Sequence, residues 1–81
     1  MKGEEKILLK TVRESRQLSQ SELARQSGVD VHKLQKYEQG QKNLNNARLK
    51  TLCKLSIALD CRISELLSEP ELIEICKKAE L

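Results

Sequence analysis

The amino-acid sequence predicts an all-α fold, and three observations support that class. Apolar residues recur at the spacing of amphipathic helices along almost the whole chain, and no segment alternates with the period of two that is typical of strands. Tyr37 is the only aromatic residue, so the core must consist of aliphatic side chains, which favours packed helices over a β-sandwich. The chain has 81 residues, which predicts a single domain over residues 1–81 with its core in about residues 7–67.

The first two helices are predicted from apolar spacing and capping chemistry. The first spans about residues 4–16 and places Leu8, Leu9 and Val12 on one face. The second spans about residues 20–27. Ser19 and Glu22 form a capping-box pattern before it, in which each side chain accepts a hydrogen bond from the other residue's backbone amide. Gly28 then ends this helix after about two and a half turns.

The third and fourth helices are predicted over about residues 31–38 and 46–59. Asp30 is a good N-cap for the third helix, because its carboxylate can accept the free amides of the first turn. Leu34 and Tyr37 lie three residues apart, so both face inward. The apolar face predicted for the fourth helix consists of Leu49, Leu52, Leu55, Ala58 and Leu59.

The end of the chain predicts a short fifth helix, ISELL, over residues 63–67 and an amphipathic helix over about residues 69–80. Ser68 and Glu71 form a second capping-box pattern there, with Pro70 in the first turn. The apolar face predicted for this last helix consists of Leu72, Ile75, Cys76 and Ala79.

Residues 19–40 have the pattern of a helix-turn-helix, in which two short helices are joined by a turn that contains glycine. Gly28 can adopt a positive φ angle in that turn, and the small Ala24 allows the two helices to cross closely. Val29, Leu34 and Tyr37 fix the second helix on the core. The N-terminal outer face of that helix is then free to enter a DNA major groove.

The order and spacing of LSQSELA, SGV, YEQG, TLCKLSIAL and ISELL resemble the phage-repressor and Cro-like helix-turn-helix family, also called the XRE type. The resemblance covers about Leu9 to Leu67. It implies an all-α, five-helix, lambda-repressor-like DNA-binding domain that acts as a dimer in transcriptional regulation. The sequence adds a C-terminal amphipathic helix to that arrangement.

The resemblance implies that Val31, His32 and Lys36 contact bases. Lysine can donate to guanine O6 and N7, histidine can donate or accept at a base edge, and valine can contact a thymine methyl group. The alternatives are a solvated surface charge for Lys36 and an exposed surface histidine for His32.

The same resemblance implies a phosphate contact for Gln20, where the amide and the dipole of the second helix also favour an anion. Lys33, Gln39 and Lys42 are predicted to contact the DNA backbone, which positions a protein without reading sequence. The alternatives are a helix-start role alone for Gln20 and solvated charges for the lysines.

Arg13 and Glu38 occupy positions that form a partly buried ion pair in many relatives, and we expect the same pair here. The chain departs from the family pattern in three places. Gln17 replaces a common glycine after the first helix, so that turn is expected to be strained or differently closed. The loop after Gly40 is about three residues longer than usual, and Arg62 replaces a small polar cap.

The charge is distributed unevenly. Residues 1–50 carry eleven basic and six acidic residues, a net of +5, whereas residues 51–81 carry four and six, a net of −2. A basic half suits a polyanion partner. Together with this charge distribution, the resemblance leads us to expect a sequence-specific regulator of repressor type that binds double-stranded DNA, and not an enzyme. The alternative is a protein-interaction module, such as an antitoxin-like or anti-repressor subunit, with weak or lost DNA binding.

Composition predicts a cytoplasmic protein without a cofactor, a metal, a small-molecule ligand or a membrane segment. No apolar stretch approaches the roughly 20 residues that span a bilayer. The three cysteines are odd in number and far apart, and no CxxC pair occurs, which favours small buried thiols over disulfides or zinc ligands.

A homodimer is expected from the symmetry of DNA sites and from spare apolar surface. The candidate residues are Leu66, Leu67, Leu72, Ile73, Ile75 and Cys76. The alternative is that the last helix only covers the core of its own chain.

Overall fold

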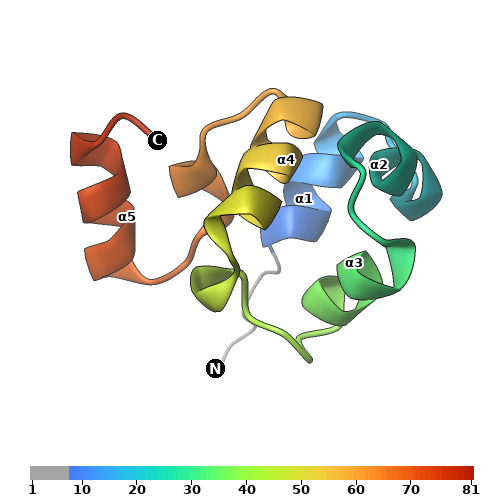
Figure 1. Ribbon diagram of the computed structural model, residues 1–81, viewed down its shortest axis with the longest axis horizontal. Coiled ribbons are helices and arrows are strands. Elements are labelled where there is room, and N and C mark those ends of the chain that lie inside the picture. Colours follow the sequence, from blue (N-terminus) through green and yellow to red (C-terminus); the bar gives the residue numbers. More distant parts are fainter. Residues whose placement is uncertain (1–7) are drawn as a thin grey trace.

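The computed structural model describes residues 8–81, and every regular element in this range is a helix (Figure 1). Residues 4–7 of the first predicted helix lie outside the described residues. The elements are α1 (Leu8–Ser15), α2 (Gln20–Ser27), α3 (Val31–Glu38), the 3-10 turn η1 (Leu44–Asn46), α4 (Leu49–Leu59), the 3-10 turn η2 (Ile63–Leu66) and α5 (Pro70–Lys78). The all-α prediction is confirmed.

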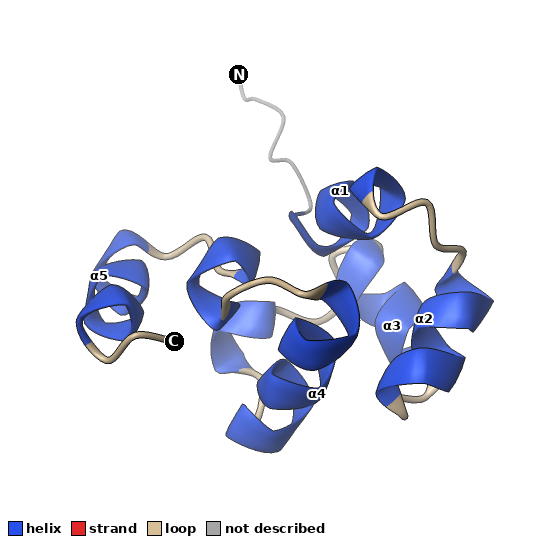
Figure 2. Cartoon of the chain, turned by 90° about the horizontal axis from the view of Figure 1, so that it is seen from above, coloured by secondary structure: helices blue, strands red, loops and turns tan. Residues whose placement is uncertain are grey.

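Helix α4 lies in the middle of the molecule, with α2 and α3 on one side of it and α5 at the opposite end (Figure 1). The view from above shows the same separation of α5 from the helix-turn-helix (Figure 2). The core between these helices is built mainly from leucine. Its most deeply buried side chains are Leu9, Leu23, Leu34, Leu55, Leu59 and Leu67.

Helix α2 begins with the predicted capping box. The hydroxyl of Ser19 accepts from the amide of Glu22 at 3.0 Å, and the carboxylate of Glu22 accepts from the amide of Ser19 at 2.8 Å. Two amides that the helix cannot satisfy are thus satisfied locally. The Ser19 bonds also lower the pKa of Glu22 below its ordinary value. This prediction is confirmed.

The turn after α1 is closed by Gln17 in the left-handed conformation, with φ 60°. The amide of Leu18 then donates to the carbonyl of Arg13 at 3.2 Å. A residue with a Cβ atom adopts this conformation at a cost of about 1–2 kcal/mol. The strain expected where the family has glycine is therefore present at Gln17.

The segment between α3 and α4 is more ordered than the sequence predicts. Leu44 is buried at the start of η1, and this turn delays the start of α4 from the predicted residue 46 to Leu49. The inward placement predicted for Leu49 is wrong, because 62% of this residue is exposed. Leu44, which the sequence places in a polar loop, is the leucine of this segment that enters the core.

The two elements predicted next also differ from the structure. The fifth predicted helix is the short turn η2, where Glu65 accepts from the amide of Arg62 at 3.1 Å. The second capping box is wrong, because α5 has Glu69 as its N-cap and that side chain makes no capping bond. The amide oxygen of Asn45 accepts instead from the amides of Ser68, at 3.0 Å, and Glu69, at 3.2 Å.

Helix α5 covers the core of its own chain with Cys76, which is buried, and with Leu72 and Ile73, which are half-buried against it. The predicted apolar face is partly wrong, since Ile75 is 55% exposed and Ala79 is exposed. Leu66 and Leu67, expected as spare surface, are buried. The covering role is therefore present, and the apolar side chain that α5 leaves exposed is Ile75.

Candidate nucleic-acid interface

The turn between α2 and α3 fixes the angle at which the two helices meet. Gly28 has φ 78°, and its amide donates to the carbonyl of Ala24 at 2.9 Å. The hydroxyl of Ser27, which is buried, accepts from the amide of Val29 at 3.1 Å. These bonds satisfy backbone groups inside the turn, so that Val29 can be buried without an unpaired amide.

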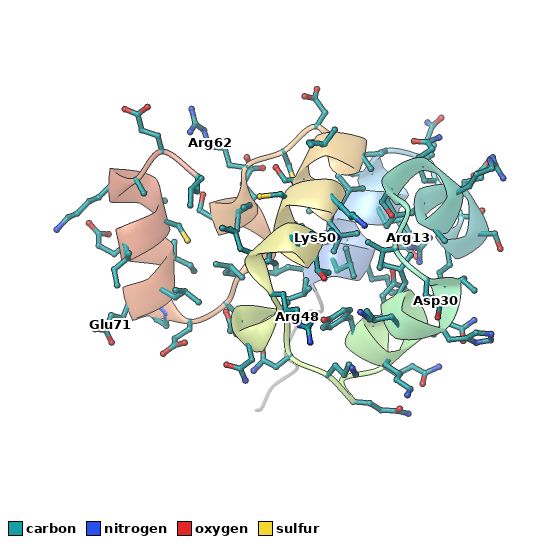
Figure 3. The ribbon with its side chains drawn as sticks, in the orientation of Figure 1. Arg13, Asp30, Arg48, Lys50, Arg62 and Glu71 are labelled. Atoms are coloured by element: carbon teal, nitrogen blue, oxygen red, sulfur yellow. The ribbon has the colours of Figure 1, made fainter. Side chains whose placement is uncertain are left out.

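Helix α3 is held on the core from one side only. Leu34 is fully buried and Tyr37 is buried, as their spacing predicts. The carboxylate of Asp30 accepts from the amides of His32, at 3.0 Å, and Lys33, at 3.3 Å. Figure 3 shows Asp30 at the start of α3, at the edge of the molecule away from α5.

Two of the three residues predicted to contact bases, His32 and Lys36, lie on the outward side of α3. His32 and Lys36 are exposed, and Val31 is half-buried. Positions 32 and 36 are four residues apart, which places them on the same face of a helix. The outward face of α3 is therefore not covered by the residues that the structure describes.

The residues predicted to contact phosphates differ in how exposed they are. Gln39 and Lys42 are exposed, whereas Lys33 and Gln20 are half-buried. The side-chain amide of Gln20 donates to the carboxylate of Glu38 at 3.0 Å. Gln20 therefore has a partner within the protein, and its backbone amide at the start of α2 is the group best placed for an anion.

Arg13 and Glu38 are brought together from α1 and α3. The Nε atom of Arg13 donates to Oε2 of Glu38 at 2.7 Å, and Nη2 donates to Oε1 at 2.9 Å. The third nitrogen, Nη1, donates to the carbonyl of Leu18 at 2.7 Å. The pair is thus bidentate and buried, a geometry that fixes the relative orientation of two planar groups. Figure 3 shows Arg13 within the body of the molecule.

The electrostatics of the pair keep both groups charged. Burial acts to raise the pKa of Glu38, but the hydrogen bonds from Arg13 and Gln20 and the charge of Arg13 outweigh burial, so the pKa lies below its ordinary value. The hydrogen bond to Glu38 raises the pKa of Arg13. The link between α1 and the end of α3 therefore persists at neutral pH.

Two further cations stand at the start of α4, where sequence reasoning assigned them no role. Arg48 is the N-cap residue of α4, Lys50 lies in its first turn, and both are exposed (Figure 3). They follow the loop that carries Lys42. The close spacing of Arg48 and Lys50 in the segment ARLK was the sequence signal that could have marked them as candidate contacts.

The described residues show no metal centre and no membrane span. Within residues 8–81, no three His, Cys, Asp or Glu side chains gather in a way that could hold a metal ion. The cysteines are free thiols, and burial raises the pKa of Cys61. None of the helices described for this range has the length and apolar character needed to cross a bilayer.

The fold and the free face of α3 define a helix-turn-helix DNA-binding protein. Residues 9–70 match the family described as the Cro/C1-type HTH DNA-binding domain, and the chain belongs to that family. The resemblance to Cro-like proteins predicted from the sequence is thus confirmed. Such domains bind double-stranded DNA and are typically not enzymes. Neither the comparison with curated proteins nor that with solved structures found a significant match.

Proposed function

We propose that this chain is a sequence-specific transcriptional regulator that inserts the outward face of α3 into the major groove of double-stranded DNA. One observation carries the proposal: Leu34 and Tyr37 bury one side of α3, while His32 and Lys36 leave the opposite side free. A helix held in this way can enter a groove without giving up its contacts with the core.

The base contacts follow from the chemistry of the outward side chains. Lys36 donates to guanine O6 and N7, and His32 donates to or accepts from a base edge. Val31, which is half-buried, offers its methyl groups to a thymine. Together these side chains read a short half-site.

The phosphate contacts position α3 in the groove. Gln39 and Lys42 approach the backbone from beyond the end of α3, Lys33 from the helix itself, and the backbone amide of Gln20 from the start of α2. Lys33 is half-buried, and a lysine can keep its apolar stem against the protein while its charged end reaches the solvent.

The Arg13–Glu38 pair sets the orientation of α3. A buried ion pair adds little net stability, but its two charged groups can pair in only a few relative orientations. Because Glu38 ends α3 and Arg13 lies on α1, the pair fixes the angle of the reading helix relative to the rest of the core.

The regulator acts as a homodimer of repressor type in the cytoplasm. A dimer places two copies of α3 about one helical turn of DNA apart on a palindromic site. Repression requires only that the bound dimer occupy a promoter. The exposed apolar side chains Ile57, Ile75 and Leu81 supply surface for the contact between copies.

The proposal is tested by selecting bound fragments from a random pool of duplex DNA and titrating the selected duplex against salt. Phosphate contacts predict a steep, linear fall of log affinity with log salt concentration. Lys36→Ala is expected to cost about 1–3 kcal/mol and to relax preference at one base pair. Lys77→Ala, on exposed α5 at the other end of the molecule, is the matched control and should leave affinity nearly unchanged.

A second candidate function is a protein-interaction module. It is favoured by the exposed apolar residues of α4, since Leu49 is 62% and Ile57 is 80% exposed, and such residues often mark interaction surfaces. This candidate predicts neither selected duplexes nor salt-dependent binding. The same experiment therefore separates the two functions.

A further inference from the structure

The side chain of Asn45 connects the loop of residues 40–45, which follows α3, to the start of α5. Its Nδ2 atom donates to Oδ1 of Asn43 at 2.8 Å and to the hydroxyl of Ser68 at 2.9 Å. Its Oδ1 atom accepts from the amides of Ser68, at 3.0 Å, and Glu69, at 3.2 Å. An amide side chain has two donor hydrogens and two acceptor lone pairs, so all four are used.

The loop held by Asn45 also contains Lys42, one of the proposed phosphate contacts. Its first residues are tied to α3, because the amides of Gln41 and Lys42 donate to the carbonyl of Lys36 at 2.8 and 3.2 Å. Leu44 anchors its middle in the core. Asn45 ties its far end to α5, so the loop is fixed to both α3 and α5.

Packing alone does not hold the loop on the side of α5. An open groove of about 640 Å³ lies between the loop, α1 and α5, and Lys42, Asn45 and Ser68 are among its lining residues. Leu44 and the partly buried Ala47 restrain the segment after Asn43 by apolar contact with the core. On the α5 side of the groove, the loop is held by the hydrogen bonds of Asn45 to Ser68 and Glu69.

We propose that Asn45 is a positioning residue for DNA binding, which holds Lys42 in place by linking its loop to α5. The inference rests on the proposed function and assigns α5 a part in it without direct DNA contact. A loop ordered before binding loses less conformational entropy when it docks, and that saving increases affinity. Loss of the Asn45 bonds removes the connection to α5 and reduces this saving.

Asn45→Ala tests the inference through DNA affinity and salt dependence, measured with the duplex that the wild-type chain selects. We expect affinity about three- to tenfold lower and a salt slope reduced by about one, the value for one lost phosphate contact. Lys42→Ala should lower the slope by the same amount, and Asn45→Ala should add little in its presence. Asn46→Ala is the matched control, because that neighbour is exposed and its bond to Asn43 is made by the backbone amide, which the substitution keeps.

The outcomes separate the inference from the proposed function. If the wild-type chain selects no duplex, the proposed function fails. If it does select one, additive effects of Asn45→Ala and Lys42→Ala, or an unchanged slope for Asn45→Ala, overturn the role of Asn45. Circular dichroism checks that each variant is folded at the temperature of measurement. Should Asn45→Ala fail to fold, Asn45→Ser is the replacement test, because the shorter serine side chain stays polar but does not reach the backbone of Ser68. The same outcomes then apply.

Discussion

The helix-turn-helix and the segment from η1 to α5 are stabilised by contacts of different range in the sequence. In the helix-turn-helix, Ser19 bonds to Glu22, Ser27 to Val29, and Asp30 to His32, all within three residues. In the second region, Asn45 bonds to Ser68 and Glu69, which are 23 and 24 residues away. The helix-turn-helix can therefore form its helix ends locally, whereas the start of α5 depends on the tertiary fold.

This difference predicts how far the effect of a substitution spreads in each region. Local caps each contribute about 1 kcal/mol and act independently. A long-range contact joins two elements that have few other contacts with each other, so its loss destabilises both elements. Glu38 is the exception within the first region, since its partners Gln20 and Arg13 are 18 and 25 residues away.

Arg13→Ala is expected to have the largest effect on stability. The substitution leaves the buried Glu38 carboxylate with Gln20 as its remaining side-chain partner, and such losses cost about 3–5 kcal/mol. Urea unfolding followed by circular dichroism measures the change. The double variant Arg13→Met/Glu38→Leu, which removes both charges, should recover much of the loss. A single variant as stable as the wild type would show that the pair is not restraining α3.

Leu44→Ala is expected to destabilise the second region by about 2–3 kcal/mol, because a buried leucine is replaced by a cavity. Leu49→Ala is the matched control, since that leucine lies five residues along the chain and is 62% exposed. Its cost should stay within about 0.5 kcal/mol. Equal costs for the two substitutions would contradict the observed exchange of roles between these leucines.

The roles of Leu44 and Leu49 also show what the sequence could and could not predict. Periodicity placed Leu34 and Tyr37 correctly because α3 is a regular helix with one buried face. It failed for Leu49 because η1 moves the start of α4 to this residue, which therefore lies at the end of the helix, while Leu52, Leu55 and Leu59 keep the predicted inward face. The turn itself begins with a local bond, in which Asn43 accepts from the amide of Asn45 at 2.9 Å, but apolar periodicity does not report it.

The candidate site divides in the same way. The outward positions of His32 and Lys36 follow from helical spacing once Leu34 and Tyr37 are buried. The bond from Gln20 to Glu38 and the amide network of Asn45 were not predicted, because each joins segments whose proximity is set only by the complete fold. The spacing of SEPE at the start of α5 matched a capping box, yet the amides of Ser68 and Glu69 are bonded by Asn45 from another element.

Acid is expected to remove part of the energy of the Arg13–Glu38 pair, with a smaller effect than Arg13→Ala. The pKa of Glu38 is lower in the folded chain than its ordinary value of 4.5. Its contribution to the free energy of unfolding is therefore complete above about pH 4.5 and falls as the pH drops toward the folded pKa. Urea midpoints measured from pH 7 down to pH 3 follow this loss. In Glu38→Gln, whose amide does not titrate, the fall below pH 4.5 should be shallower, and an identical fall would assign it to other carboxylates.

Ser19→Ala and Ser68→Ala compare the true capping box with the apparent one and are expected to give the smallest effects. Ser19→Ala removes the bond to the Glu22 amide and should cost about 1 kcal/mol. Ser68→Ala removes an exposed bond from Asn45 but leaves the backbone amides of Ser68 and Glu69 bonded to Asn45, so its cost should be about half as large or less. Thermal unfolding of the two variants side by side measures the difference. The reverse order would mean that Ser68 caps α5 after all, and that both regions begin their helices by local chemistry.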